Sequence, residues 1–259
     1  MTDFKNIRVD VSESIGTLTI DRPAVKNALN LETVQECGHA LDRLAADADV
    51  GVLIITGAGE SSFVSGADIN DIRARSQADG LAAINSSLFA QIERFPRPTI
   101  AAINGYALGV GCTMTLLCDI RLAAEEAKMS FLFPRMGVMA ELGSTYLLPR
   151  LVGIGRACEL MFTGKTYSAA ECERAGLVNH VVPGAQLLSF AGEMAREIAQ
   201  CAPLSVALTR QALYQGLQSS FEAQVRHEGF TLEYLYRSAD HAEAVRAFKE
   251  KRAPAFRGR

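Results

Sequence analysis

Hydrophobic and polar positions alternate along the first part of the chain. The segments IRVDV and GTLTIDRP show this period of two, which is typical of half-buried strands and predicts two short strands that close at Pro23. The next segment, from about Leu31 to Ala46, carries apolar residues at helical spacing, with Leu41 and Leu44 on its inner side. We therefore predict a helix over this segment.

Two apolar runs of strand length follow, and each leads into a turn rich in small residues. The run GVLIITG precedes the loop GAGESSFVSGAD and a helical stretch up to Phe95. The run from Thr99 to Ile103 leads into a glycine-punctuated turn, a helix and a strand from Asp119 to Ala123. This repeated order predicts an α/β core whose loops gather at one edge of the sheet.

Beyond about Leu187 the pattern is typical of helices only. Breaks are expected near Pro203 and Ser219, and the chain closes with the basic segment VRAFKEKRAPAFRGR. We divide the chain into a core, residues 1–186, and a helical C-terminal region, residues 187–259, which packs on the core or on another subunit.

Composition and charge narrow the class of protein. The chain has 259 residues, and a hydrophobic content of 49% is sufficient for a substantial core. Its 26 basic and 29 acidic residues argue against a nucleic-acid partner and require local cations for any anionic ligand. No apolar run approaches the roughly 20 residues that span a bilayer, so we expect a soluble protein without a membrane partner. The six cysteines form no CxxC pair, which favours a reducing, cytoplasmic location.

Several common chemistries lack their residues in this chain. It contains no HExxH, no GxSxG and no Walker A sequence, and its four histidines are scattered. Glycines 105, 109 and 111 lack the third member of a dinucleotide-binding GxGxxG motif. No Asp-rich metal loop is present either. We therefore expect neither a bound metal nor a resident cofactor.

Two glycine-containing turns stand where a predicted strand meets a predicted helix. They are Ser65-Gly66-Ala67-Asp68 and Gly109-Val110-Gly111. Small residues let the main chain approach a ligand, and the start of a helix offers unsatisfied N–H groups. Two such donors aimed at one point would form an oxyanion hole. For either turn alone, glycines that only serve a tight turn are the favoured interpretation.

A single carboxylate, Glu141, stands among apolar and small residues in the stretch MGVMAELGSTYLLPR. A buried, unpaired carboxylate is costly because its charged form loses water. Such a group lies near a surface or serves chemistry. An apolar setting that includes Phe133, Met136, Met139 and Leu142 would raise its pKa toward the range of a general base.

A series of motifs along nearly the whole chain resembles the enoyl-CoA hydratase/isomerase (crotonase) family. In order they are DRPAVKNALN, FVSGADI, PTIAAINGYALGVGC, CDIRLAA, FTGKTYSAAE, AGLVNHVV and AFKEKRAPAF. The resemblance implies a crotonase-like spiral of ββα units with a helical C-terminal trimerisation region. It also implies an acyl-CoA thioester substrate, with CoA as part of that substrate and no separate cofactor, and a homotrimer or a dimer of trimers.

The resemblance also assigns roles to individual residues. In the family, main-chain N–H groups at the positions of Ala67 and Val110 hold the thioester oxygen. Members that hydrate a double bond use two glutamates, and this chain has Thr113 and Phe133 at those positions. Glu141 falls where isomerases with a single acid carry their carboxylate. This implies an enzyme that shifts a double bond from C3 to C2 through a dienolate.

Contacts to CoA are implied by the same resemblance. Lys26 and the backbone around Ala24 and Ala28 are expected near the pantetheine and adenine, as is Ile69. Phe248 and Lys251 match C-terminal residues that reach the nucleotide of a neighbouring subunit. A solvated helix face for Lys251 and a partly disordered tail EKRAPAFRGR are the competing interpretations.

Other functions stay open on the sequence. One is an enoyl-CoA hydratase, or another CoA lyase or hydrolase, whose water is activated by Glu141 alone. Another is a non-catalytic acyl-CoA-binding protein or scaffold subunit, which the loss of both hydratase glutamates favours. Glu141 itself could be a solvated residue at a helix N-terminus. Acyl length and branching are not determined by these patterns.

Overall fold

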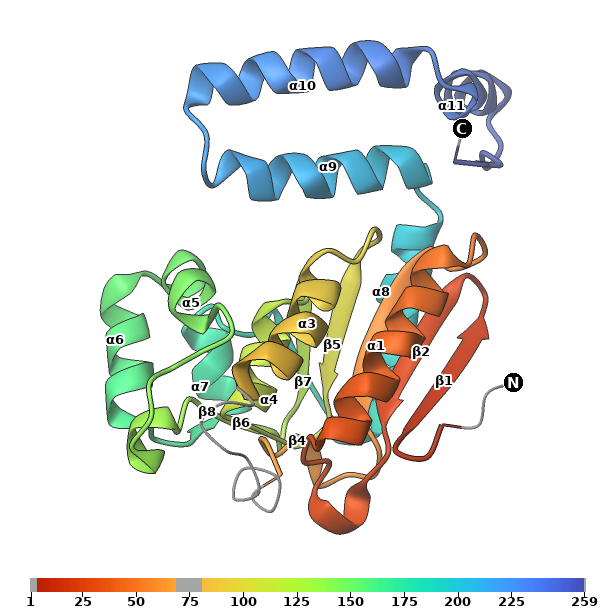
Figure 1. Ribbon diagram of the computed structural model, residues 1–259. Helices are drawn as coiled ribbons and strands as arrows, with labels where there is room; N and C mark the ends of the chain where they lie inside the picture. Colours follow the sequence, from red (N-terminus) through yellow and green to blue (C-terminus); the bar gives the residue numbers. More distant parts are fainter. Residues whose placement is uncertain (1–3, 69–80, 259) are drawn as a thin grey trace.

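A computed structural model describes residues 4–68 and 81–258 (Figure 1). Its larger sheet has six strands in the order β1-β2-β3-β5-β7-β10. Only β1 and β2 are antiparallel, and the other neighbours are parallel. The strands are β1 (Ile7–Ser12), β2 (Ile15–Ile20), β3 (Val52–Gly57), β5 (Thr99–Ile103), β7 (Ile120–Ala124) and β10 (His180–Val182).

A smaller sheet of four strands runs in the order β4-β6-β8-β9. Its strands are β4 (Ser62–Val64), β6 (Tyr106–Leu108), β8 (Lys128–Ser130) and β9 (Tyr167–Ser168). After β3, β5 and β7 the chain therefore moves from the large sheet to the small one and then reaches a helix. This repetition confirms the expected spiral of ββα units. It also places the ends of β4 and β6 next to each other.

The helices follow the predicted periodicity closely. The predicted helix over 31–46 is α1 (Leu31–Ala46), whose first turn is capped by Asn30 accepting from the Thr33 N–H. The other helices of the core are α3 (Leu81–Glu93), α4 (Val110–Leu116), α5 (Ser144–Val152), α6 (Ile154–Thr163), α7 (Ala169–Arg174) and α8 (Leu187–Ala199). Short 3-10 turns are η1 (Pro23–Val25), η2 (Phe133–Met136) and η3 (Gly184–Gln186).

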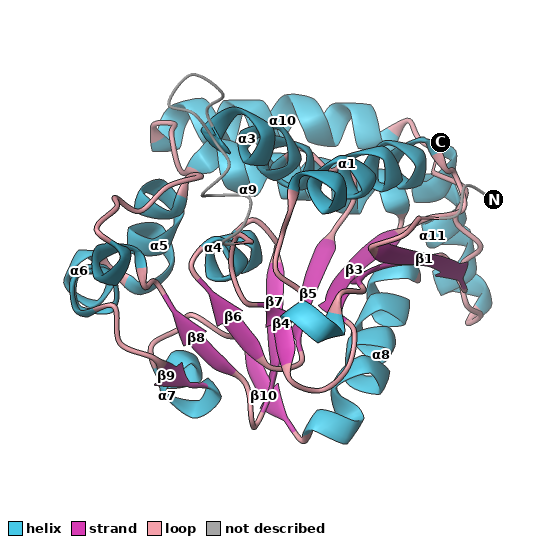
Figure 2. Ribbon diagram, turned by 60° about the horizontal axis from the view of Figure 1, so that its bottom comes forward, coloured by secondary structure: helices cyan, strands magenta, loops and turns pink. Residues whose placement is uncertain are grey.

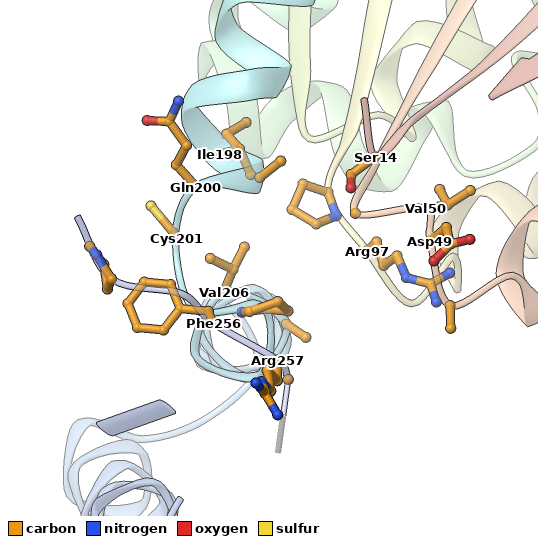
Figure 3. Close-up of a pocket in the computed structure, with 18 of the residues that line it drawn as sticks. Ser14, Asp49, Val50, Arg97, Ile198, Gln200, Cys201, Val206, Phe256 and Arg257 are labelled. Carbon is orange, nitrogen blue, oxygen red and sulfur yellow. The ribbon is translucent and has the colours of Figure 1, made fainter. Parts of the chain in front are cut away.

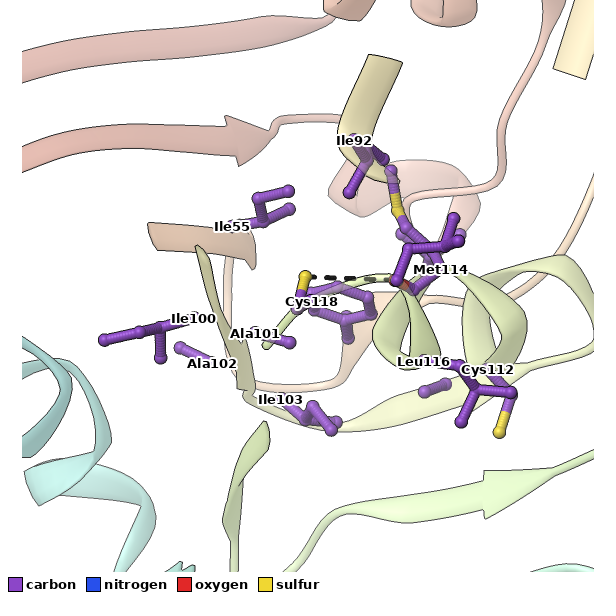
Figure 4. Close-up of a cluster of buried hydrophobic side chains, with 14 of the residues drawn as sticks. Ile55, Ile92, Ile100, Ala101, Ala102, Ile103, Cys112, Met114, Leu116 and Cys118 are labelled. Carbon is purple, nitrogen blue, oxygen red and sulfur yellow. Dashed lines mark hydrogen bonds between the residues drawn. The ribbon is translucent and has the colours of Figure 1, made fainter. Parts of the chain in front are cut away.

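The sheets are covered on both sides. Figure 2 shows α1 and α3 on one side of the large sheet and α8 on the other. Figure 4 shows Ile55 of β3 and Met114 of α4 on one side of the large sheet, while Ile100 of β5 faces the other side, and all three are fully buried. Burial of each such side chain contributes about 1.5–3 kcal/mol. Helix α4 itself packs against β4 and β6, the strands that lead into the two glycine-containing turns.

The C-terminal helices are α9 (Pro203–Gly216), α10 (Phe221–Tyr236) and α11 (Ala239–Glu250). Their breaks lie at Pro203 and near Ser219, as predicted. Figure 1 shows α9 to α11 extending away from the sheets, and we call residues 203–258 the C-terminal arm. The sequence-based division instead begins the C-terminal region at residue 187. Helix α8 packs on β2, β3, β5 and β7, so the structural break falls after α8.

No helix within residues 4–68 and 81–258 combines the length and apolar character needed to cross a membrane. The arm nevertheless exposes large apolar side chains, among them Leu213, Phe221, Phe230 and Phe248.

Candidate active site

The two glycine-containing turns lie side by side in the fold. Strands β4 and β6 pair in parallel, with Val64 opposite Ala107, so both turns leave the same edge of the small sheet. A Cβ on Gly111 would lie 2.0 Å from the Val64 carbonyl oxygen. Only glycine permits this approach of α4 to the end of β4. Gly66 has φ of 121°, which also requires glycine.

The N–H of Ala67 is not used by the segment with which Ala67 pairs. Ala67 forms an isolated parallel bridge with Leu29. In this bridge the Leu29 N–H donates to the Gly66 carbonyl at 2.9 Å, and the Asp68 N–H donates to the Leu29 carbonyl at 2.9 Å. In a parallel ladder the residue between those two partners directs its own N–H to the opposite side. The Ala67 N–H is therefore turned away from Leu29.

The N–H of Val110 is free because Val110 is the first residue of α4. Gly109 precedes it with φ of 54°, and the Gly109 N–H donates to the Ser130 carbonyl at 2.9 Å. Neither the Ala67 nor the Val110 N–H has an acceptor within residues 4–68 and 81–258. The arrangement can therefore supply two main-chain donors to an oxyanion.

Glu141 lies in the loop between η2 and α5, two residues before the helix N-cap Gly143. Its carbonyl accepts from the Ser144 N–H at 3.1 Å and from the Ser144 hydroxyl at 2.8 Å. Leu142 follows in the left-handed region with φ of 57°. These contacts fix the backbone of Glu141 just before the N-terminus of α5, outside the helix itself.

The Glu141 side chain is half-buried and has no hydrogen-bond or ion-pair partner in the described part of the chain. Burial raises the pKa of its carboxyl above the ordinary value of 4.5. The expected apolar surroundings are only partly present, because Phe133 is buried but Met136 and Met139 are 59% and 81% exposed. The carboxylate thus has the raised pKa of a general base without a structural partner.

The loop that carries Glu141 contacts the second glycine-containing turn at one end and the helix that follows this turn at the other. At its start, the Leu132 side chain lies 3.9 Å from the Cβ position of Gly109. At its end, α5 packs against α4. Both ends of the loop from Leu132 to Ser144 therefore lie close to Gly109 and α4, which position the N–H of Val110.

Comparison with known proteins places this site in a family. The family described as enoyl-CoA hydratase/isomerase matches residues 10–259. The chain belongs to this family. A short-chain-enoyl-CoA hydratase of Clostridium acetobutylicum is 35% identical over 252 residues, covering 96% of this chain and 97% of that protein. A 2,3-dehydroadipyl-CoA hydratase of Escherichia coli is 35% identical, with 93% and 94% covered.

Solved structures agree with the fold. An enoyl-CoA hydratase from Bacillus anthracis superposes with a TM-score of 0.96 at 35% identity, covering 98% of this chain and all of that chain. A chain from Geobacillus kaustophilus has a TM-score of 0.93 at 31% identity, with both chains fully covered. As a member of the enoyl-CoA hydratase/isomerase family, the protein is an enzyme whose family acts on acyl-CoA thioesters.

The positions of the two family hydratase glutamates contain no carboxylate in this family member. Thr113 is fully buried in α4, and its hydroxyl donates to the Gly109 carbonyl at 3.4 Å. Phe133 is a buried ring at the start of η2. Neither side chain can accept a proton near neutral pH.

The loop expected to contact CoA lies beside the first oxyanion turn. Ala24 and Lys26 are exposed, and Lys26 has φ of 54°. The Lys26 carbonyl accepts from the Ser65 N–H at 3.2 Å. Ala28 comes two residues later, and its carbonyl accepts a hydrogen bond from Arg22. Lys26 and Ala28 are therefore held near Ala67, and Ala24 precedes them in η1. Ile69 lies outside the described residues.

Two residues that sequence reasoning missed hold this loop. Asn27 is fully buried, and its amide donates to the Ala58 and Ser62 carbonyls at 3.0 and 2.7 Å. Arg22 pairs with Asp68 at 3.2 Å, directly after Ala67. Both belong to the motif DRPAVKNALN. The signal available in the sequence was Asn27, a polar residue of the kind that hydrogen-bonds the backbone in turns.

Phe248 and Lys251 lie apart from these elements within one chain. Figures 1 and 2 both show α11 away from β4, β6 and α4. Phe248 is 87% exposed, and Lys251 ends α11 in the left-handed region. Asp240 accepts from the Arg257 and Gly258 N–H groups at 2.7 and 2.8 Å. These contacts hold the end of the tail against α11, and partial disorder of the tail stays a competing prediction.

Proposed function

We propose that the enzyme shifts the double bond of a 3-enoyl-CoA thioester to C2, with Glu141 as its single acid and base. The observation that supports this is the half-buried, unpaired Glu141 carboxylate, with no second carboxylate at Thr113 or Phe133. Isomerisation moves one proton between two carbons of the same substrate, so one carboxylate is sufficient.

In the proposed reaction, ionised Glu141 removes a proton from C2. The electron pair of that C–H bond forms the C2 part of a dienolate, and the negative charge rests on the thioester oxygen. The main-chain N–H groups of Ala67 and Val110 stabilise this oxygen. Protonated Glu141 then returns the proton to C4, which leaves the double bond between C2 and C3. Atoms and charge balance without a co-reactant.

The expected contributions of these groups to the reaction rate are large enough for an enzyme. A positioned general base contributes about 10²–10⁴-fold to the rate. Each oxyanion donor contributes about 10²–10³-fold, because the donor is already aimed where the charge develops. A raised pKa brings the basicity of Glu141 closer to that needed to remove a carbon-bound proton.

Hydration of a 2-enoyl-CoA is the second candidate. The names of relatives favour it, including a crotonyl-CoA hydratase of Syntrophomonas wolfei that is 37% identical over 255 residues. In this reaction Glu141 alone would activate the water that attacks C3 and would deliver the proton to C2. The same oxyanion donors would stabilise the enolate.

We further propose that Ala24, Lys26, Ala28 and Ile69 contact the CoA part of the substrate. Phe248 and Lys251 would contact the nucleotide bound by a neighbouring subunit of a homotrimer or dimer of trimers. The separation of α11 from the site and the exposed apolar side chains of the arm support an assembly in which another chain covers them. A cytoplasmic location stays a prediction.

The two reactions are separated by incubating the purified protein with a 3-enoyl-CoA and, separately, with a 2-enoyl-CoA. Rising absorbance of the conjugated thioester at unchanged product mass, from the 3-enoyl substrate, is the expected result. A product heavier by one water from the 2-enoyl substrate would establish hydration instead. Binding of both thioesters without turnover would identify a non-catalytic acyl-CoA-binding protein.

The activity should depend on pH through Glu141. Because the base must be ionised, kcat/KM rises as the pH rises through the pKa of Glu141. Burial raises this pKa, so the midpoint of the acid limb should lie above the ordinary value of 4.5. The check is kcat/KM between about pH 4 and pH 8, with circular dichroism at each pH to show that the fold is intact. A midpoint at or below the ordinary glutamate value would contradict a buried base.

A further inference from the structure

One partly buried carboxylate connects the C-terminal arm to the core. In the described residues, the side-chain hydrogen bonds from the arm to the core come from Arg210 and Tyr214 on α9. Arg210 Nε donates to both carboxylate oxygens of Asp119, at 2.9 and 2.8 Å, and the Tyr214 hydroxyl donates to Asp119 at 2.8 Å. Arg210 also donates to the Glu93 carbonyl at 3.0 Å.

Asp119 occupies a central place in the core. It follows α4 and immediately precedes β7, and it accepts from the Thr99 N–H and hydroxyl at 2.8 and 3.0 Å at the start of β5. The side chains of Arg210 and Asp119 are only 13% and 17% exposed. A shielded pair of this kind is weakly screened by salt, and removal of one partner leaves the other charge uncompensated.

A cavity of about 690 Å³ lies at the joint between arm and core (Figure 3). Ser14, Val50 and Arg97 line it from the core, and Val206 and Phe256 line it from the arm. The cavity shares no lining residue with the candidate active site.

The arm is held together by its own contacts. Helix α10 packs on α9 and on α11, and the Gln224 amide donates to the Ala212 carbonyl at 2.9 Å. Glu243 accepts from Arg252 at 2.6 Å and from the Ala255 N–H at 3.0 Å, which ties the tail to α11. The arm therefore has the internal contacts of a unit, joined to α8 by the linker from Gln200 to Ala202.

We propose that Asp119 is a positioning residue that sets the orientation of the C-terminal arm. Through Arg210 and Tyr214 it holds α9 against the core, and without it the arm turns about the linker from Gln200 to Ala202. As a consequence Asp119 places Phe248 and Lys251 for the CoA nucleotide. Only this consequence rests on the proposed function.

The orientation is tested by hydrogen exchange in the full-length protein, followed by mass spectrometry of peptides covering residues 196–216. Arg210→Met should raise exchange in the linker and α9 at least about tenfold, because exchange reports the population of the open form. Tyr214→Phe removes only the hydroxyl and should raise exchange less. Arg226→Met, at an exposed site on α10, is the matched control and should leave exchange unchanged. Unchanged exchange in both cluster variants would overturn the proposal.

The placement of Phe248 and Lys251 for the CoA nucleotide is tested by measuring KM and kcat separately. Arg210→Met should raise KM for the acyl-CoA about tenfold with kcat within about twofold, since the nucleotide contact adds uniform binding. KM for the matching acyl-pantetheine, which lacks the nucleotide, should not change. Raised exchange with an unchanged KM would remove the link to CoA and leave the positioning of the arm. If the unmodified protein turns over neither enoyl-CoA, the proposed function fails, and the affinity for free CoA replaces KM in the same comparison.

Discussion

Replacing Glu141 by Gln should lower kcat for double-bond migration by about 10²–10⁴-fold, the usual contribution of a positioned base. The amide has nearly the same shape but cannot take a proton from C2. KM should change little, since the CoA contacts lie elsewhere. The measurement is steady-state conversion of a 3-enoyl-CoA, compared with the unmodified enzyme at the pH of its plateau.

Stability separates a chemical effect from a folding defect. Because burial raises the pKa of Glu141, its ionised form costs folding free energy at any pH above that pKa. The uncharged Gln removes this cost, so the variant should unfold at the same or a higher temperature near neutral pH. Glu193→Gln, at an exposed site on α8, is the matched control. Migration at the unmodified rate in Glu141→Gln would exclude Glu141 as the base.

Replacing Gly111 by Ala should lower kcat/KM by at least about 10²-fold, the loss expected for one oxyanion donor. The added Cβ would meet the Val64 carbonyl oxygen at 2.0 Å, a contact with rigid backbone. Relief of this overlap must move the start of α4 away from the end of β4. The N–H groups of Val110 and Ala67 would then no longer point at one oxygen.

A matched substitution tests whether this effect is specific. Gly155→Ala places its Cβ in open space on α6 and should leave activity and melting temperature nearly unchanged. Circular dichroism and thermal melts of Gly111→Ala show how much folded enzyme is present, and rates are compared per folded molecule. Full activity of folded Gly111→Ala would contradict the role of the two turns.

Local patterns were sufficient for the elements of the core. The strand over 99–103 and the helix over 31–46 were predicted with the bounds that the structure has. Their signals are periods of two and 3.6, which arise within a few residues and need no distant partner. The division after residue 186 used the same kind of signal, but an amphipathic helix does not reveal which surface it covers. Helix α8 and the helices of the arm look alike in sequence, and only the contacts of α8 assign it to the core.

The candidate site shows the same limit. The sequence marked Gly66 and Gly111 as special, but the distance of the Gly111 Cβ position from Val64 exists only once β4 and β6 are paired. Similarly, the direction of the Ala67 N–H depends on its bridge to Leu29.

By itself the sequence determined the α/β class, the bounds of several core elements and the presence of one carboxylate, Glu141, in an apolar stretch, because these follow from residue types and short-range periodicity. Tertiary structure alone decided that Glu141 is half-buried and without a partner in the described residues, that Arg22 pairs with Asp68 beside Ala67, and that Arg210 reaches Asp119 across 91 positions. These features depend on contacts between distant segments, and burial and hydrogen-bond partners become defined only when those segments pack together.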